Sequence, residues 1–160
     1  MKRIIVFFVL LVFAWPAYGQ EMMLEGLWEL KTTISIPGSP QAIPPQTIKH
    51  CYTKAEAQKQ ADGVPANKDC KMTKHNVTGN KVTWEMVCTG QQKGTMTGEV
   101  IQGKGTTQSR TKSTLNGMTT ETYTETTYGK DTMQSRTKST MQGMTTETQT
   151  TGKRLGNCPS

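Results

Sequence analysis

The chain has 160 residues, a formal net charge of +7 at pH 7 and only 33% hydrophobic residues. This length fits one domain, and a core built from so few apolar side chains is thin. The Lys and Arg side chains are spread along the chain and no aromatic stacking set accompanies them, which argues against nucleic-acid binding.

Residues 1–19 have the three parts of an export signal. A basic Lys2-Arg3 start precedes the apolar run 4–14, which ends before the small residues of an Ala-Tyr-Gly cleavage site. This run is too short to span about 30 Å of hydrocarbon at about 1.5 Å per residue. The sequence therefore predicts a signal peptide over 1–19, a single mature domain over 20–160, a periplasmic or secreted location and no stable membrane insertion.

Four cysteines lie in the predicted mature domain: Cys51, Cys70, Cys88 and Cys158. An even number of cysteines in an oxidising compartment predicts disulfides. Metal binding is the alternative, but no two cysteines lie within four residues of each other and the chain has only two histidines.

Apolar side chains alternate over 24–36, which predicts a first strand with one buried face. The Pro-rich segment 37–45 cannot be a central strand and predicts a loop. A short helix is predicted over 53–61, with Thr53 as its N-terminal cap.

A hairpin is predicted where 70–77 and 81–88 flank a three-residue loop. Such a loop pairs Val77 with Lys81, Met72 with Met86 and Cys70 with Cys88. Opposed residues on neighbouring strands lie about as far apart as a disulfide requires. Of three connectivities this favours Cys70–Cys88, which leaves Cys51–Cys158 as the second bridge.

The C-terminal third contains an internal repeat. Residues 108–122 recur as 134–148, and only two positions differ between the copies. Each copy predicts a hairpin, around Asn116-Gly117 in the first and around Gln142-Gly143 in the second.

The two-residue turns assign the faces of these hairpins. In the first copy Ser113 pairs with Thr120 on one face, and Lys112 pairs with Glu121 on the other. The charged face is predicted to be the solvent-exposed one, because burying ion pairs is costly. The other face is therefore predicted to point inward as a ligand-binding lining that consists of Thr111, Ser113, Leu115, Met118, Thr120, Thr122, Thr137, Ser139, Met141 and Met144.

These segments give eight predicted strands, at 24–36, 70–77, 81–88, 94–102, 106–115, 118–128, 131–141 and 144–154. The predicted fold is all-β, an antiparallel up-and-down meander that is barrel-like or strongly curved. If the first strand pairs with the last, the barrel holds side chains or one small ligand. A curved open sheet with unpaired ends is the alternative.

The chain resembles the bacterial secreted family called domain of unknown function 3617. The residues that carry this resemblance are Gly26-Leu27-Trp28-Glu29, Cys51, the Cys70–Cys88 hairpin with Gly79-Asn80 and Trp84, and Arg154-Leu155-Gly156-Asn157-Cys158. As its name implies, this family brings no activity.

A Gly-x-Trp motif on the first strand, with Arg154 near the end of the last, is also similar to the lipocalin pattern. That resemblance implies an arginine that covers the tryptophan at the closed end of a barrel. Gly26, Trp28, Trp84 and Arg154 are therefore expected to be structural, and function does not follow from fold alone.

No catalytic set is found, and the sequence predicts neither an enzyme nor a cofactor. His75 is expected on the outward face opposite Thr83, and His50, next to a bridging cysteine, is expected to be structural. Thioether sulfur selects Cu(I), but Leu115 replaces Met141 in the first repeat, so that position needs bulk and not sulfur. No metal site is predicted.

The sequence thus predicts an exported, non-enzymatic protein that binds a small hydrophobic or amphipathic ligand in a cavity lined by Thr, Ser and Met. The alternative is a module that binds an envelope protein or cell-wall partner through its outer surface. The spread positive charge favours weak contact with anionic envelope components.

Overall fold

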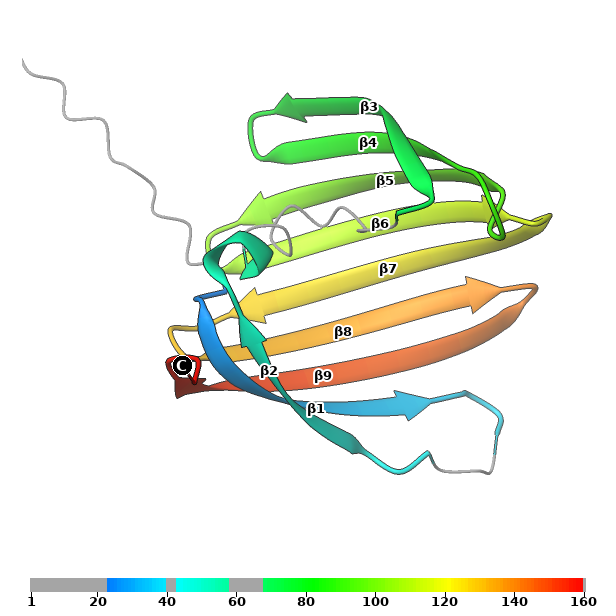
Figure 1. Ribbon diagram of the computed structural model, residues 1–160. Helices are drawn as coiled ribbons and strands as arrows, with labels where there is room; N and C mark the ends of the chain where they lie inside the picture. Colours follow the sequence, from blue (N-terminus) through cyan, green and yellow to red (C-terminus); the bar gives the residue numbers. More distant parts are fainter. Residues whose placement is uncertain (1–22, 40–42, 58–67, 160) are drawn as a thin grey trace, which may run out of the picture.

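The computed structural model describes residues 23–39, 43–57 and 68–159. Within these residues the chain forms one antiparallel sheet (Figure 1). Its strands are β1 (Gly26–Ser35), β2 (Gln46–Tyr52), β3 (Cys70–Thr78), β4 (Lys81–Cys88), β5 (Gly94–Gly103), β6 (Thr106–Leu115), β7 (Met118–Tyr128), β8 (Thr132–Met141) and β9 (Met144–Gly156).

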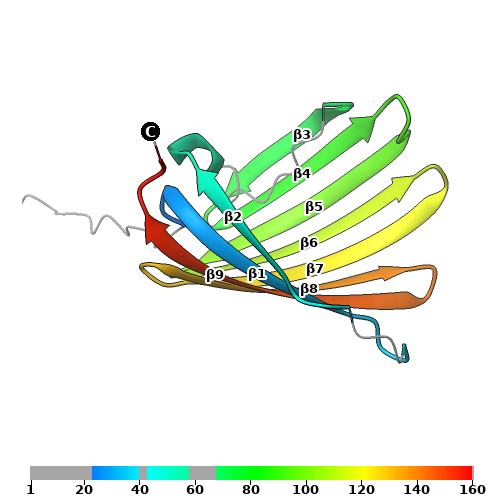
Figure 2. The same ribbon diagram turned by 60° about the horizontal axis from the view of Figure 1, so that its bottom comes forward.

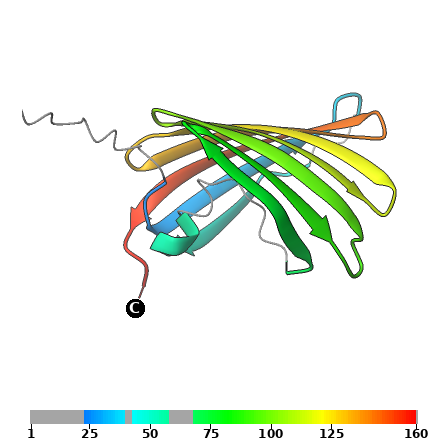
Figure 3. The same cartoon turned by 90° about the horizontal axis from the view of Figure 1, so that it is seen from above.

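The strand order is β2-β1-β9-β8-β7-β6-β5-β4-β3. The predicted all-β meander is confirmed, and so is the pairing of the first strand with the last, since Trp28 lies opposite Arg154. The sheet curls strongly but does not close, as Figures 2 and 3 show. Its two edges are β2 and β3, so the predicted curved form is the observed one and the closed barrel is not formed.

Strand β2 was not predicted from the sequence. It pairs only with β1, from Gly26 opposite Tyr52 to Thr32 opposite Gln46. Most of its side chains are exposed, because it forms an edge of the sheet. It therefore lacks the buried alternation by which a half-covered strand is recognised.

The predicted helix is present over 54–57, and its remainder at 58–61 lies outside the described residues. Thr53 caps it as expected. The Glu56 amide donates to Thr53 Oγ1 (3.3 Å), and the Thr53 amide donates to Glu56 Oε2 (2.9 Å). This reciprocal pair is a capping box.

The β3–β4 hairpin has a different register from the predicted one. Its turn contains two residues, so Val77 lies opposite Val82 and not Lys81. A bulge around Thr73 then adds one residue to β3 and returns Cys70 to its place opposite Cys88. Both predicted disulfides, Cys70–Cys88 and Cys51–Cys158, are formed.

The buried side chains gather on one face of the sheet, called here the inner face. At one end Trp28, Leu30, Tyr52 and Tyr128 form a cluster with Met23. A second group of buried side chains, from β4 and β5, consists of Val82, Trp84, Met86, Cys88 and Val100. The opposite face, called the outer face, carries every charged side chain of β4–β9 except Arg154.

Candidate functional site

A cavity of about 380 Å³ lies on the inner face and is called here the inner trough. Its apolar and aromatic lining comes from Leu30 on β1, Tyr52 on β2, Tyr128 on β7 and Met133 on β8. Three of these residues belong to the main buried cluster, and Met133 packs against it. The trough is therefore continuous with the main core.

Hydroxyl groups from neighbouring strands line the rest of the inner trough: Thr32, Thr107, Ser109, Thr124, Thr126, Ser135 and Thr150. Several of them are paired across strands. Thr126 Oγ1 donates to Ser135 Oγ (3.0 Å), and the Thr32 and Thr150 hydroxyls lie 3.1 Å apart. A hydroxyl has one donor and two acceptor sites, so each paired group keeps capacity for a further hydrogen bond.

This hydroxyl ladder continues along β7 and β8 beyond the trough. Thr124 and Thr137 are 3.0 Å apart, and Thr122 and Ser139 are 3.1 Å apart. The hydroxyls stand opposite one another because directly opposed residues of two antiparallel strands point their side chains to the same face of the sheet. The ladder therefore gives the inner face of β7 and β8 a regular polar surface without charge.

Tyr128 lies at the apolar end of the inner trough. Burial raises the pKa of its phenol, and hydrogen bonds with Thr126 and Thr107 partly offset this rise. The phenol is therefore protonated at neutral pH and offers both a donor and an acceptor. None of the described residues that line the trough carries a charge.

The ten predicted ligand-binding residues lie elsewhere on the same face. Those on the strands (Thr111, Ser113, Thr120, Thr122, Thr137 and Ser139) are half-buried, as is Leu115, but none of the ten lines the inner trough. Met118, Met141 and Met144 have the predicted inner-face register, but their side chains are 47%, 39% and 63% exposed. They sit where β6–β7 and β8–β9 turn, and no other strand covers these hairpin tips.

The same registry, continued from Thr122 towards Tyr128, leads to the trough residues Thr124 and Thr126. The sequence contained this signal, because the two sets share one strand and one face. It contained no signal for Tyr52, whose strand β2 was not predicted.

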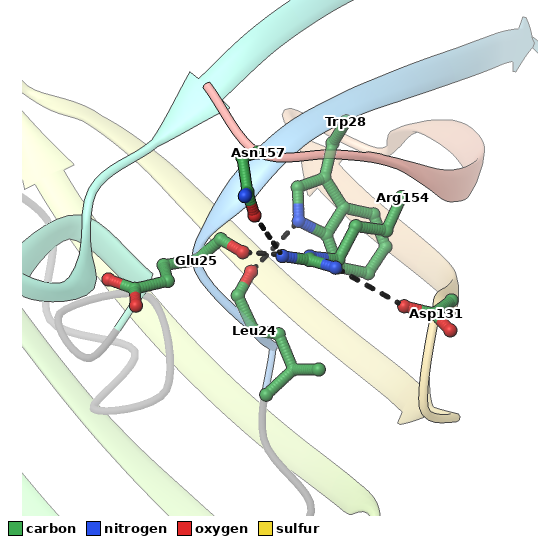
Figure 4. Close-up of polar contacts among 6 residues, drawn as sticks. All are labelled: Leu24, Glu25, Trp28, Asp131, Arg154 and Asn157. Atoms are coloured by element: carbon green, nitrogen blue, oxygen red, sulfur yellow. Dashed lines mark hydrogen bonds and ion pairs between the residues drawn. The ribbon is translucent and has the colours of Figure 1, made fainter. Parts of the chain in front are cut away.

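Trp28 and Arg154, two of the predicted structural residues, form a polar clamp with the chain just before β1 (Figure 4). The Trp28 indole Nε1 donates to the Leu24 carbonyl (2.9 Å), and Arg154 Nε donates to the Glu25 carbonyl (2.8 Å). Gly26 has φ +131°, and a Cβ there would overlap the Gly156 carbonyl and the Arg154 side chain. Glycine is therefore required at this position.

The Arg154 guanidinium is held on two further sides. It pairs with Asp131 (3.7 Å) and donates to Asn157 Oδ1 (3.4 Å), and both contacts are drawn in Figure 4. The clamp therefore ties the last strand to the start of the first, which is a structural role.

A family model described as "Protein of unknown function (DUF3617)" matches residues 23–158. The chain belongs to the DUF3617 family. This confirms the resemblance predicted from the cysteines and the terminal motifs, whereas the lipocalin resemblance is not confirmed. No curated protein and no solved structure matches the chain.

The two histidines of this DUF3617 chain lie on β3 and β2, near opposite edges of the sheet. His75 lies opposite Trp84 and not Thr83, because the two-residue turn shifts its partner by one residue, and its side chain is exposed. His50 contacts Tyr52 edge to face, with ring centroids 4.4 Å apart. Among the described residues, no three or more His, Cys, Asp or Glu side chains are placed to hold a metal ion, and no helix is long and apolar enough to cross a membrane.

Trp84, also predicted to be structural, is buried against β5. Gly98 lies directly opposite it, and a Cβ on Gly98 would overlap the indole ring. The missing side chain thus allows the indole to lie flat on the neighbouring strand. Within the described part of the chain, the buried Trp84 Nε1 has no hydrogen-bond partner.

Proposed function

We propose that this DUF3617 member is a periplasmic or secreted, non-enzymatic binding protein that holds a small, uncharged amphipathic ligand in the inner trough. The observation that carries the proposal is the composition of the trough, which joins Tyr52, Tyr128, Leu30 and Met133 to a set of hydroxyls. Its volume of about 380 Å³ falls within the range of about 300–1,000 Å³ that is typical of small-molecule sites.

The ligand is expected to be uncharged because of what its burial would cost. A charged group taken from water into a site without a charged partner loses far more hydration free energy than a hydroxyl does. The hydroxyls of Thr126 and Ser135 each keep capacity for a further hydrogen bond and match a neutral polar head. The apolar tail would then lie against Leu30 and Met133.

Export rests on two features. No cysteine among the described residues is free, and paired cysteines are typical of oxidising compartments. The predicted signal peptide over 1–19 lies outside the described residues. N-terminal sequencing of the protein from a periplasmic extract is expected to begin at Gln20, and a chain that starts at Met1 would contradict export by this signal.

The binding proposal is tested with N-phenyl-1-naphthylamine, an uncharged dye that fluoresces in apolar sites. The mature protein is expected to bind it, 1-decanol is expected to displace it, and decanoate is expected to compete at least tenfold less well. The replacement Ser135→Phe fills the trough and should weaken dye binding at least tenfold.

The matched control is Ser139→Phe, which adds the same bulk to the same face of β8 outside the trough. It should change dye binding less than twofold. Absence of dye binding to the unaltered protein, or an equal loss in both variants, would overturn the proposal. Native mass spectrometry of protein from its own periplasm would identify the natural ligand.

A further inference from the structure

The outer face has a groove of its own, which crosses the sheet from β4 to β8 and has a volume of about 530 Å³. Its centre is a row of three opposed side chains: Arg110 on β6, Tyr123 on β7 and Lys138 on β8. Tyr123 is the one aromatic side chain that β4–β9 place on this face, and it is 36% exposed. This outer groove is separated from the inner trough by the sheet itself.

Two cations of the outer groove lie opposite an acidic residue in the register without a salt bridge to it: Arg110 opposite Glu99, and Lys138 opposite Glu147. The Arg110 guanidinium lies over the Tyr123 ring, 5.6 Å from its centroid, in a cation–π contact. Within the part of the chain that the structure describes, neither Arg110 nor Lys138 forms an ion pair. By contrast, Lys112 is paired with Glu121 in the same groove (2.9 Å).

Glu99 lies directly opposite Arg110 in the register and is nevertheless engaged elsewhere. Its carboxylate pairs with Lys81 at 2.8 Å, and the hydrogen bond and charge of Lys81 lower the pKa of Glu99, with a smaller contribution from the charge of Arg110, which forms no salt bridge to it. Arg110 therefore keeps guanidinium donors that are free for an anion outside the protein. A planar guanidinium fits a carboxylate particularly well, because it can form two parallel hydrogen bonds.

The remaining lining of the groove is polar but uncharged, with threonines Thr83, Thr97 and Thr140. An aromatic ring beside hydroxyls and two unpaired cations matches a sugar ring that bears a carboxylate. The ring would present its C–H face to Tyr123, its carboxylate to Arg110 and Lys138, and its hydroxyls to the threonines. We propose that the outer groove binds an acidic saccharide of the uronic acid class.

The internal repeat supplies a control for this assignment. Arg136 is the counterpart of Arg110, on the same face and 26 residues later in the repeat. Its neighbours across the sheet are Glu125 and Gln149, whereas Arg110 has Glu99 and Tyr123. The two arginines thus differ mainly in the aromatic ring that only Arg110 contacts.

The test is isothermal titration calorimetry of the mature protein with tetragalacturonate. Binding is expected, Arg110→Gln and Tyr123→Leu are each expected to weaken it at least tenfold, and Arg136→Gln should change it less than twofold. The neutral tetrasaccharide maltotetraose should bind at least tenfold more weakly than tetragalacturonate. Thermal melting of each variant shows that a lost signal does not come from unfolding.

Three outcomes would overturn the proposal. The first is no binding of tetragalacturonate, and the second is an equal loss in Arg110→Gln and Arg136→Gln, which would indicate general attraction to positive charge. The third is equally tight binding of hexaglutamate or of anionic phospholipid vesicles, which would assign the groove to peptides or membranes. Tetragalacturonate is not expected to displace the dye from the inner trough, so either binding proposal can be overturned without the other.

Discussion

At the scale of single residues, Tyr128 links the chemistry of the inner trough to the stability of the fold. The phenol is buried, and its pKa lies above the ordinary value of 10.0 because burial disfavours the phenolate. The folded protein therefore holds this proton more tightly than the unfolded chain does. Its contribution to stability is complete below about pH 10 and is lost as the pH rises through the raised pKa.

We therefore expect the free energy of unfolding to fall above pH 10, by as much as about 1.4 kcal/mol per pH unit from this one proton. Urea denaturation between pH 8 and pH 11 measures the slope, and Tyr128→Phe should reduce it. Tyr123→Phe makes the same replacement at an exposed position, so a larger reduction of the slope in Tyr128→Phe assigns the effect to the buried phenol. An unchanged slope in Tyr128→Phe would contradict this account.

At the scale of elements, turn chemistry made most of the sheet predictable. The turns Asn116-Gly117 and Gln142-Gly143 fixed the register of two hairpins, and the structure has the predicted pairs. The β3–β4 hairpin was harder, because its shorter turn and the bulge around Thr73 are two deviations that cancel at the cysteines. The predicted disulfide was therefore right although the predicted register near the turn was wrong.

Long-range features limited the prediction of the site. The inner trough needs Tyr52, whose strand lies at an edge and shows no buried alternation. The outer groove joins side chains from five strands. Which of its cations form salt bridges depends on diagonal contacts between strands, such as that of Lys81 with Glu99. A list of directly opposed residues pairs Glu99 with Arg110 instead, so the free cation was not visible in the sequence.

The two copies of the repeat differ at Asn116 and Gln142 for a structural reason. Asn116 Nδ2 donates to the Gln91 carbonyl (2.8 Å), and Asn116 Oδ1 accepts from the Lys93 amide (3.1 Å). The first hairpin thus holds the β4–β5 loop through its turn. Both turn residues have positive φ (51° and 50°), which asparagine adopts more readily than glutamine.

We expect Asn116→Gln to lower the free energy of unfolding by about 1–3 kcal/mol, because two hydrogen bonds and a favourable turn residue are lost. The reciprocal change Gln142→Asn should be neutral or stabilising by a few tenths of a kcal/mol, roughly the scale of turn preferences. Urea denaturation at pH 7 measures both. Changes in the free energy of unfolding that are equal in size and opposite in sign would show that only the turn preference differs and that the loop contacts contribute nothing.

At the scale of the whole molecule, the open sheet is held by its two disulfides in different ways. Cys70–Cys88 joins neighbouring strands that are 18 residues apart in the chain. Cys51–Cys158 spans 107 residues and ties edge strand β2 to the segment after β9. The second bridge therefore restrains the strand that contributes Tyr52 to the inner trough, as well as closing the longer loop.

We expect the pair of changes Cys51→Ser and Cys158→Ser to cost about 4–5 kcal/mol, and the pair Cys70→Ser and Cys88→Ser about 3 kcal/mol, because the entropy of the unfolded chain rises with loop length. Urea denaturation of both double variants measures this order. Dye binding measures a second effect, the positioning of β2. Without the longer bridge β2 is less restrained, so dye binding in the inner trough should weaken even where the protein is still folded. The reverse order of stabilities, or unchanged dye affinity in the folded Cys51→Ser, Cys158→Ser protein, would show that the bridge neither orders the open sheet nor positions Tyr52.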